Sequence, residues 1–245
     1  MAGQRPSGTD TTALWFNPPG DVGSGRRTLT LERVVAEALA VIAADGAQSL
    51  GMRALAARLG VVPGALYRHV RGKEQLYDLV LDAVLGEVDC RADPAASWAE
   101  QVAALARRLR VVLEARPGTA ALLKTRDPLS PTSLDLAEAF LASLLAAGLP
   151  GREAALAFRL VYDYTLGFAL SDPTSPAEQR LRDTATREQL HAFFDALPAG
   201  RFPALSVCGL HAWDGDRDQR FTAGLETLLR GLQADMRPPE ASGES

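Results

Sequence analysis

Apolar residues recur at three- and four-residue spacing along most of the chain, which is the period of an amphipathic α-helix. The first clear case follows Thr28 and Thr30, either of which can cap a helix, and it stops at Gly46. The apolar positions of this segment are Val34, Ala38, Val41 and Ile42. The pattern predicts a helix that packs one face on a core.

Two shorter helices and a longer one are predicted next, at Gly51–Leu59, Pro63–His69 and Lys73–Cys90. Proline suits the first turn of a helix, because its missing N–H has no partner there. Further helices are expected near residues 95–115, 117–125, 131–147, 151–171, 176–197 and 216–235. The one plausible strand is Ala204–Leu210, which is short and contains Gly209. We therefore predict an all-α fold without internal repeats.

Composition and charge narrow the class of protein. The chain is 47% hydrophobic, enough for a sizeable core, but no apolar run approaches the ~20 residues of a membrane helix. We therefore expect a cytoplasmic protein with no membrane partner. The isolated Cys90 and Cys208 predict neither a disulfide nor a metal site, and no cofactor or metal is expected.

The net charge of −4 is unevenly distributed. Residues 1–75 contain 9 basic and 6 acidic side chains, whereas the remainder contains 17 basic and 24 acidic ones. A basic end on an acidic body is compatible with DNA binding confined to that end.

The stretch from Met52 to Leu76 has the pattern of a helix-turn-helix. Ala56 is small enough for close helix approach, Gly60 supplies the turn, and Val61 fills the gap between the helices. The core-facing residues of the second helix are Leu66 and Val70, and its predicted outer face consists of Pro63, Gly64, Ala65, Tyr67, Arg68 and His69. Such a helix can enter the major groove of DNA.

This stretch resembles the DNA-binding domain of the TetR family of bacterial repressors. The family's recognition helix has the form LYxHV-x-x-K, which residues 66–73 match at every fixed position, and Leu55-Ala56-x-x-Leu59-Gly60-Val61 matches the helix and turn before it. The resemblance covers residues 28–88. Without the surrounding motif, the sequence is equally consistent with Tyr67 as a core aromatic residue and with His69 as an ordinary surface histidine.

The resemblance implies contacts with DNA for eight residues. Phosphate contacts are expected from Tyr67, His69 and Lys73, a base or phosphate contact from Arg53, and base reading from Val62, Gly64, Ala65 and Arg68. Arg68 is the candidate for bidentate guanine recognition. Arg26 and Arg27 are within reach of a phosphate or the minor groove.

The remainder of the chain resembles the tetracycline-repressor-like ligand-binding and dimerisation domain more loosely. We divide the chain into a disordered arm (1–27), the helix-turn-helix domain (28–73), a connecting helix (74–92), this larger domain (93–237) and a disordered tail (238–245). The resemblance implies a homodimer whose interface includes Leu160, Tyr164, Phe221, Leu225, Leu228 and Leu232. The alternative is that these apolar stripes are buried within one subunit.

A small-molecule effector is also implied. Candidate lining residues are Trp98, Leu105, Leu122, Phe140, Phe158, Tyr162 and Phe168, each of which is otherwise a simple core residue. Their mixture predicts an apolar or aromatic ligand. Tetracycline repressors hold magnesium partly with a pocket histidine, but His191 and His211 both lie late in this chain, so magnesium–tetracycline sensing is not expected.

We therefore expect a sequence-specific DNA-binding transcriptional regulator, a repressor that an effector releases from a palindromic operator. One alternative is a helix-turn-helix regulator without an effector, which a fully packed C-terminal core would favour. The other is a helical enzyme with an unrecognised site. The sequence contains no GxSxG, HExxH, P-loop or CxxC motif, so no enzymatic activity is expected.

Overall fold

The computed structural model describes residues 29–126, 129–171, 183–198, 200–213 and 216–235. Within these ranges it contains α-helices and one 3₁₀ turn and no strand, which confirms the all-α prediction. The chain divides into two compact units, Met1–Ala147 and Gly148–Ser245. The expected arm, with Arg26 and Arg27, and the expected tail lie outside the described residues.

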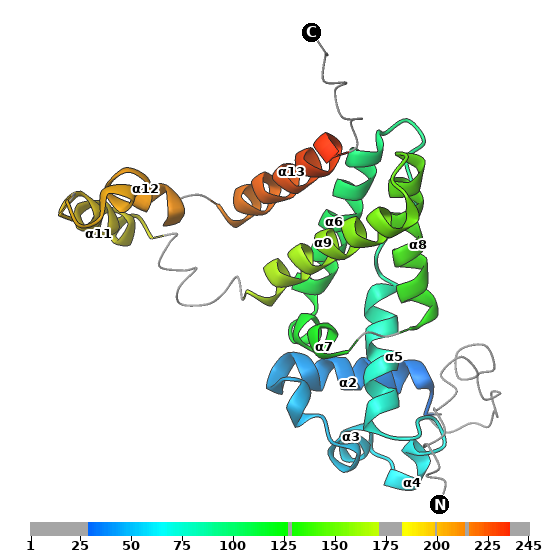
Figure 1. Ribbon diagram of the computed structural model, residues 1–245. Coiled ribbons are helices and arrows are strands. Elements are labelled where there is room, and N and C mark those ends of the chain that lie inside the picture. Colours follow the sequence, from blue (N-terminus) through cyan, green and yellow to red (C-terminus); the bar gives the residue numbers. More distant parts are fainter. Residues whose placement is uncertain (1–28, 127–128, 172–182, 199, 214–215, 236–245) are drawn as a thin grey trace, which may run out of the picture. The chain divides into compact units, whose positions relative to one another are not determined.

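The first unit begins with a small helical head (Figure 1). It comprises α2 (Leu31–Asp45), the 3₁₀ turn η1 (Ala47–Ser49), α3 (Met52–Leu59), α4 (Pro63–Leu66) and α5 (Lys73–Leu85). Thr30 is the N-cap of α2, since its hydroxyl accepts a hydrogen bond from the backbone N–H of Arg33 at 3.3 Å. The fully buried Ala38, Leu55 and Leu66 come from α2, α3 and α4, so the three helices share one core.

Helix α4 is shorter than the predicted Pro63–His69. Its regular part ends at Leu66, and the chain then tightens into a turn in which the N–H groups of Arg68 and His69 donate to the carbonyls three residues earlier. Such i→i+3 bonds are typical of a final helical turn. The turn brings Val70 into the core, where it is 1% exposed.

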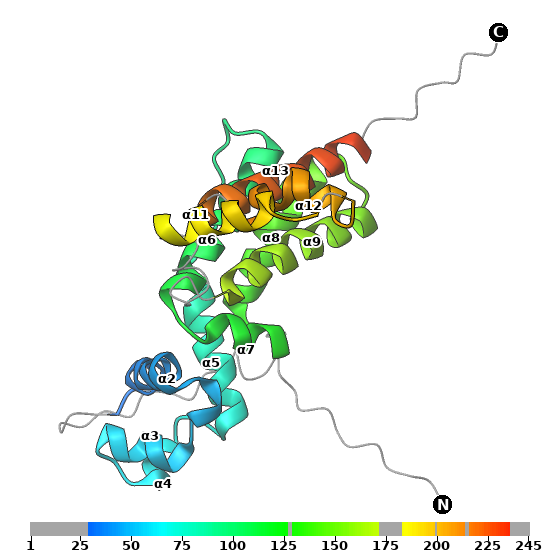
Figure 2. The same cartoon turned by 90° about the vertical axis from the view of Figure 1, so that its left-hand side faces the viewer.

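Helix α5 runs from the head to three further helices of the same unit, α6 (Trp98–Ala115), α7 (Thr119–Thr125) and α8 (Pro131–Ala146), as Figures 1 and 2 show. It is joined to α8 at Asp82, whose carboxylate and carbonyl both accept from the hydroxyl of Thr132, at 2.6 and 2.8 Å. Helix α6 starts with a capping box between Ser97 and Glu100. The packing of α6 and α8 against α5 explains why the unit extends past the boundary expected at residues 92–93.

The second unit contains α9 (Gly151–Leu170), α11 (Thr184–Asp195), α12 (Pro203–Trp213) and α13 (Arg217–Asp235). The possible strand at Ala204–Leu210 was wrong, because this segment is the body of α12. Gly209 lies against Phe194 of α11, and a Cβ atom at Gly209 would be 2.7 Å from Cε1 of that ring. The glycine therefore permits close approach of two helices and does not mark a strand.

Aromatic residues join α9 to α13 within the second unit. The rings of Tyr164 and Phe221 stack with centroids 5.4 Å apart, and Phe168 meets Phe221 edge-on at 5.2 Å. The guanidinium of the buried Arg217 lies over the Phe168 ring and donates to the carbonyl of the same residue. This cation therefore satisfies a carbonyl at the C-terminal end of α9 while it packs on the aromatic cluster.

Candidate nucleic-acid interface and effector pocket

The turn between α3 and α4 depends on Gly60. This residue adopts φ +70°, a left-handed conformation in which glycine carries no steric penalty. The N–H groups of Gly60 and Val61 donate to the carbonyls of Ala57 and Ala56, at 3.1 and 3.0 Å, so the last carbonyls of α3 are satisfied. The turn sets the direction in which α4 leaves α3.

Most of the residues expected to contact DNA lie at the surface of the head. Arg53, Val62, Gly64, Tyr67 and Arg68 are exposed, with Val62 70% and Tyr67 53% accessible to solvent. The side chains of Arg53 and Arg68 make no hydrogen bond or ion pair within the described ranges. Both cations therefore have their full hydrogen-bonding capacity available for an acidic partner.

Ala65 departs from the sequence prediction. It was expected on the outer face of the recognition helix, but its side chain is only 9% exposed. The reason is geometric: Ala65 is adjacent to the fully buried Leu66 on a helix of a single turn, and both side chains are directed into the head. Contact of its methyl group with a thymine is therefore not supported.

Lys73 and His69 are half-buried. The ammonium of Lys73 donates to the carbonyl of Gln48 at 3.3 Å and lies 5.3 Å from the centroid of the Tyr77 ring. These contacts hold the lysine at the first turn of α5, beside the head. An ammonium has three N–H donors, so the contact with Gln48 leaves donors for a phosphate.

A second cation lies near the Tyr77 ring. Arg126, just after α7, has its guanidinium 5.5 Å from the Tyr77 ring centroid and forms ion pairs with Glu74 and Asp78, the latter at 2.8 Å. Tyr77 itself donates to the carbonyl of Ala47. The first two turns of α5 are thus tied both to the head and to the end of α7.

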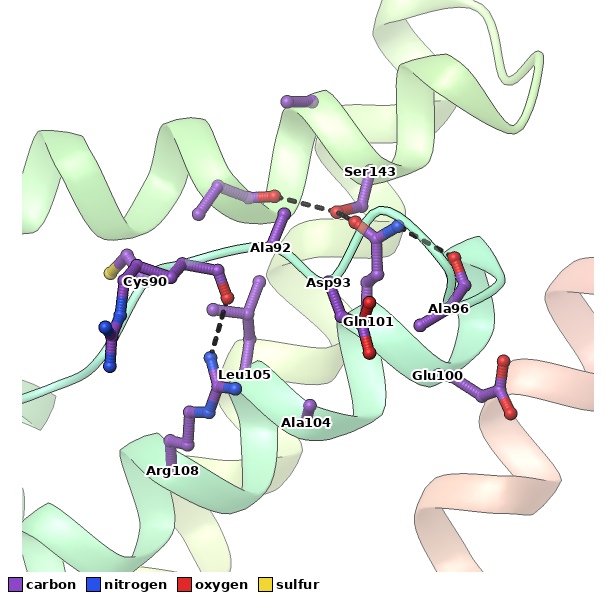
Figure 3. Close-up of a pocket in the computed structure, with 13 residues that line it drawn as sticks. Cys90, Ala92, Asp93, Ala96, Glu100, Gln101, Ala104, Leu105, Arg108 and Ser143 are labelled. Carbon is purple, nitrogen blue, oxygen red and sulfur yellow. Dashed lines mark hydrogen bonds between the residues drawn. The ribbon is translucent and has the colours of Figure 1, made fainter.

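A cavity of about 420 Å³ lies in the same unit, between α6, α8 and the segment that connects α5 to α6. Figure 3 shows its walls. They consist of Cys90, Arg91, Ala92, Asp93, Ala96, Glu100, Gln101, Ala104, Leu105, Arg108, Ala139, Ala142 and Ser143. The volume falls within the range of small-molecule sites. The space exists because several of the lining residues are alanines, whose side chains are short.

The polar groups of the cavity are fixed by contacts to one another. Gln101 donates to the carbonyl of Ala96 at 2.9 Å, and its side-chain oxygen accepts from the hydroxyl of Ser143 at 3.2 Å. Arg108 donates to the carbonyls of Asp89 and Arg91 at 2.7 and 2.9 Å. These bonds hold the side chains in place before any ligand enters, as binding sites require.

Two ionisable groups beside the cavity are perturbed. Burial raises the pKa of the Cys90 thiol, and the nearby carboxylates of Asp135 and Asp89 act in the same direction. Hydrogen bonds from Arg91 hold the pKa of the Asp89 carboxylate well below its usual value. Cys90 is therefore a neutral, weakly polar part of the wall at neutral pH.

Of the residues expected to line a ligand pocket, Leu105 is in this cavity. Phe140 and Leu122 are buried core residues of the first unit, and Trp98 is half-buried. The others, Phe158, Tyr162 and Phe168, belong to the second unit, where Phe158 and Tyr162 pack on each other with ring centroids 5.7 Å apart.

Sequence reasoning missed the other residues of the cavity because it searched for large aromatic side chains. A usable signal was present: Gln101, Ala104, Leu105 and Arg108 recur at helical spacing on α6 and combine small, apolar and polar character. A helix face of that composition indicates the wall of a pocket.

The candidate dimer residues fall into two groups. Phe221 and Leu225 are buried within the protomer, at 1% and 0% exposure, so they do not supply an open face. Leu160 is 46% exposed, and Leu228, Leu232 and Tyr164 are half-buried.

None of the described helices is long and apolar enough to cross a membrane. No group of three or more histidine, cysteine or acidic side chains among these residues is arranged to hold a metal ion.

A basic helix-turn-helix head followed by a helical body defines a class of DNA-binding regulators. Residues 34–80 match the family described as bacterial regulatory proteins, tetR family, and residues 92–236 match the tetracyclin repressor-like C-terminal domain. The chain belongs to the TetR family of helix-turn-helix transcriptional regulators.

Several relatives match over nearly the full length of the chain. An HTH-type transcriptional regulator of Saccharopolyspora erythraea is 34% identical over 223 residues, which cover 91% of this chain and 92% of that protein. The HTH-type transcriptional repressor DrrR1 of Streptomyces coeruleorubidus is 32% identical, covering 90% and 83%. The apo structure of ActR from Streptomyces coelicolor has a TM-score of 0.74 at 34% identity, covering 86% of this chain and 97% of that one; ActR has also been solved in complex with actinorhodin.

Proposed function

We propose that this chain is a homodimeric repressor that binds a palindromic operator and is released from it by a small-molecule effector. The observation that carries the proposal is the pairing of an exposed recognition surface at α3 and α4 with a 420 Å³ cavity in the same unit. Because such a regulator acts on chromosomal DNA, we place it in the cytoplasm of a bacterium.

Seven residues form the proposed DNA surface. Tyr67, His69 and Lys73 contact phosphates, and Arg53 contacts a phosphate or a base. Arg68 reads a guanine, and the backbone at Gly64 approaches the bases closely. Val62, 70% exposed, adds an apolar contact to the bases. Phosphate contacts fix the register of the protein, and the base contacts provide specificity.

The cavity supports an effector-responsive regulator over one without an effector. A fully packed core would leave no room for a ligand, whereas this cavity has the volume of a typical ligand site and prearranged polar groups. Its connecting segment, residues 86–97, directly follows the helix that carries Lys73. An effector can shift the DNA-binding equilibrium by its difference in affinity for the two states.

Dimerisation follows from the small size of the recognition element. One turn of helix reaches few base pairs, and two such heads related by symmetry read half-sites about one helical turn, ~34–36 Å, apart. The exposed Leu160, with Leu228 and Leu232, supplies the apolar surface for a partner.

The test is selection of bound DNA from a random oligonucleotide library by the full chain, followed by affinity measurements on the selected site at several salt concentrations. We expect a palindromic sequence. Tyr67→Phe removes a single hydroxyl from an exposed ring, and we expect it to weaken binding at every salt concentration without changing the salt dependence, because a neutral hydroxyl displaces no counterion.

The matched control is Arg152→Ala, which removes an exposed charge at the start of α9. It should leave both affinity and salt dependence unchanged. Enrichment of no sequence, or a loss of affinity with Arg152→Ala as large as with Tyr67→Phe, would contradict the assignment of this surface.

A further inference from the structure

The charges of the cavity are separated along α6. Arg108 and Glu100 lie at opposite ends of the view in Figure 3, and they are eight positions apart on the helix, about 12 Å at its rise per residue. Asp93 and Glu100 are exposed, and the Glu100 carboxylate accepts from the N–H and the hydroxyl of Ser97 at 2.8 and 2.6 Å. A ligand that enters this space therefore meets one half-buried charge, that of Arg108, at the positive end of the cavity.

Arg108 is the half-buried cation of the positive end, and its charge is not paired with a carboxylate. Its Nη1 atom donates to two neutral main-chain carbonyls, those of Asp89 and Arg91. Its Nε and Nη2 atoms have no acceptor among the described residues. By contrast, Arg91 is highly exposed and is already paired with Asp89 at 2.8 Å.

A guanidinium forms its strongest hydrogen bonds with an anionic oxygen, often through two parallel N–H donors. The Nε and Nη2 atoms of Arg108 lie on one edge of such a fork, so the unused donors match a carboxylate in geometry and in charge. The carboxylates of Asp93 and Glu100 are exposed to solvent, which screens their charges, so the half-buried guanidinium of Arg108 is the group that attracts the acidic part of a ligand.

The remaining wall is suited to an apolar body. It is built largely from the methyl groups of Ala92, Ala96, Ala104, Ala139 and Ala142. These short side chains leave room for an apolar group between α6 and α8.

We propose that the effector is an acidic molecule with an apolar body, and that Arg108 both binds its acidic group and transmits its presence to the DNA-binding head. The proposal rests on the proposed function, because it names the ligand class and the regulation of the same cavity. Arg108 is the contact between α6 and the carbonyls at residues 89 and 91 of the connecting segment. A carboxylate on the Nε and Nη2 edge leaves the Nη1 bonds to these carbonyls in place and fixes the guanidinium, so the segment that follows α5 is held more rigidly.

The experiment uses two probes that differ in charge, anthraquinone-2-carboxylate and anthraquinone-2-carboxamide. Binding of each to the full chain is measured by calorimetry, and hydrogen exchange of residues 86–97 is followed by mass spectrometry. We expect the carboxylate to bind at least tenfold more tightly than the carboxamide. We also expect it to slow exchange in the connecting segment.

Three variants separate ligand recognition from a structural role. Arg108→Gln should abolish the preference for the carboxylate, whereas Arg108→Lys keeps the positive charge and should retain part of it. Arg107→Gln changes the neighbouring, exposed arginine, which does not line the cavity, and should behave as the unmodified chain. If Arg108→Gln accelerates exchange but keeps the preference, Arg108 is only a structural contact and the proposal fails.

Equal affinity for the two probes, tighter binding of the carboxamide, or binding of neither probe would also overturn the proposal. None of these measurements contains DNA. Failure of the operator selection would therefore count against the proposed function alone, and failure here would leave DNA binding untouched.

Discussion

The phenol of Tyr164 lies directly on Gly224, where α9 crosses α13. A Cβ atom added at Gly224 would be 2.8 Å from Cζ of the ring, and the tyrosine hydroxyl donates to the carbonyl of Phe221 at 3.0 Å. The absence of a side chain at residue 224 is therefore a condition for this hydrogen bond and for the ring stacking beside it.

Gly224→Ala should destabilise the protein. The added methyl group forces Tyr164 to move, and overpacking of this kind costs about 1–3 kcal/mol. Urea denaturation followed by circular dichroism measures the difference. Gly231→Ala on the same helix is the control, because nothing lies within 4 Å of its Cβ position and alanine favours a helix by about 0.5–1 kcal/mol. Equal effects of the two variants would refute the crossing geometry.

Arg68→Ala should change which bases the protein prefers. A bidentate contact with guanine is worth about 1–3 kcal/mol of discrimination, and the exposed, unpaired guanidinium of Arg68 is positioned to make one. A randomised operator library measures the preference. The control is Arg71→Ala, which removes an exposed charge from the following turn and should weaken binding, if at all, equally for all sequences. An unchanged preference would exclude Arg68 as a base reader.

Leu160→Glu and Leu228→Glu should each produce folded monomers. Leu160 is 46% exposed in the protomer, so a charge there is solvated in the monomer but buried without a partner in the dimer. Analytical ultracentrifugation measures the association state. Leu134→Glu is matched in exposure, at 47%, but lies on α8, and it should remain dimeric. A persistent dimer in the first two variants would show that the interface lies elsewhere.

Alkylation of the two cysteines should distinguish the cavity from the surface. Iodoacetamide reacts with the thiolate, and burial raises the pKa of Cys90, so Cys90 is largely protonated at neutral pH. We expect the exposed Cys208 to react faster at pH 7, because it is open to the reagent and because the raised pKa of Cys90 lowers the thiolate fraction of that residue. Raising the pH should narrow the difference, because the Cys90 thiolate then becomes populated.

Occupation of the cavity should protect Cys90 further, and Cys208 is the internal control in the same sample. Mass spectrometry of the alkylated peptides gives both rates. Equal rates at pH 7 would be inconsistent with the half-buried position of Cys90, and protection of Cys208 instead would place the ligand elsewhere.

Local features were predicted well from the sequence because local physics determines them. Thr30, Gly60 and Pro63 stand at a cap, a left-handed turn and a first helical turn, and each residue type is favoured there for its own conformational reason. The all-α fold followed from the same kind of signal. The direction of Ala65 did not, because a helix of one turn has too few residues to define a face.

Features that depend on tertiary packing were harder to predict. Gly209 was noted only as a residue within the one plausible strand, yet its position admits the ring of Phe194 from α11. The cavity was missed for a related reason. It consists of volume that residues such as Ala139 and Ala142 leave unfilled, and unfilled volume appears only when α6 and α8 are placed side by side.

The brevity of α4 also bears on how the regulator would respond to its own abundance. A head with one helical turn, Pro63–Leu66, holds DNA weakly when it binds alone. In a dimer, the second head binds at the high effective concentration set by its tether to the first, and this avidity is lost when the dimer dissociates. Operator occupancy would then fall with the square of protomer concentration once the chain is dilute enough to dissociate. A modest drop in expression would derepress the target genes more sharply than a one-to-one binding curve allows.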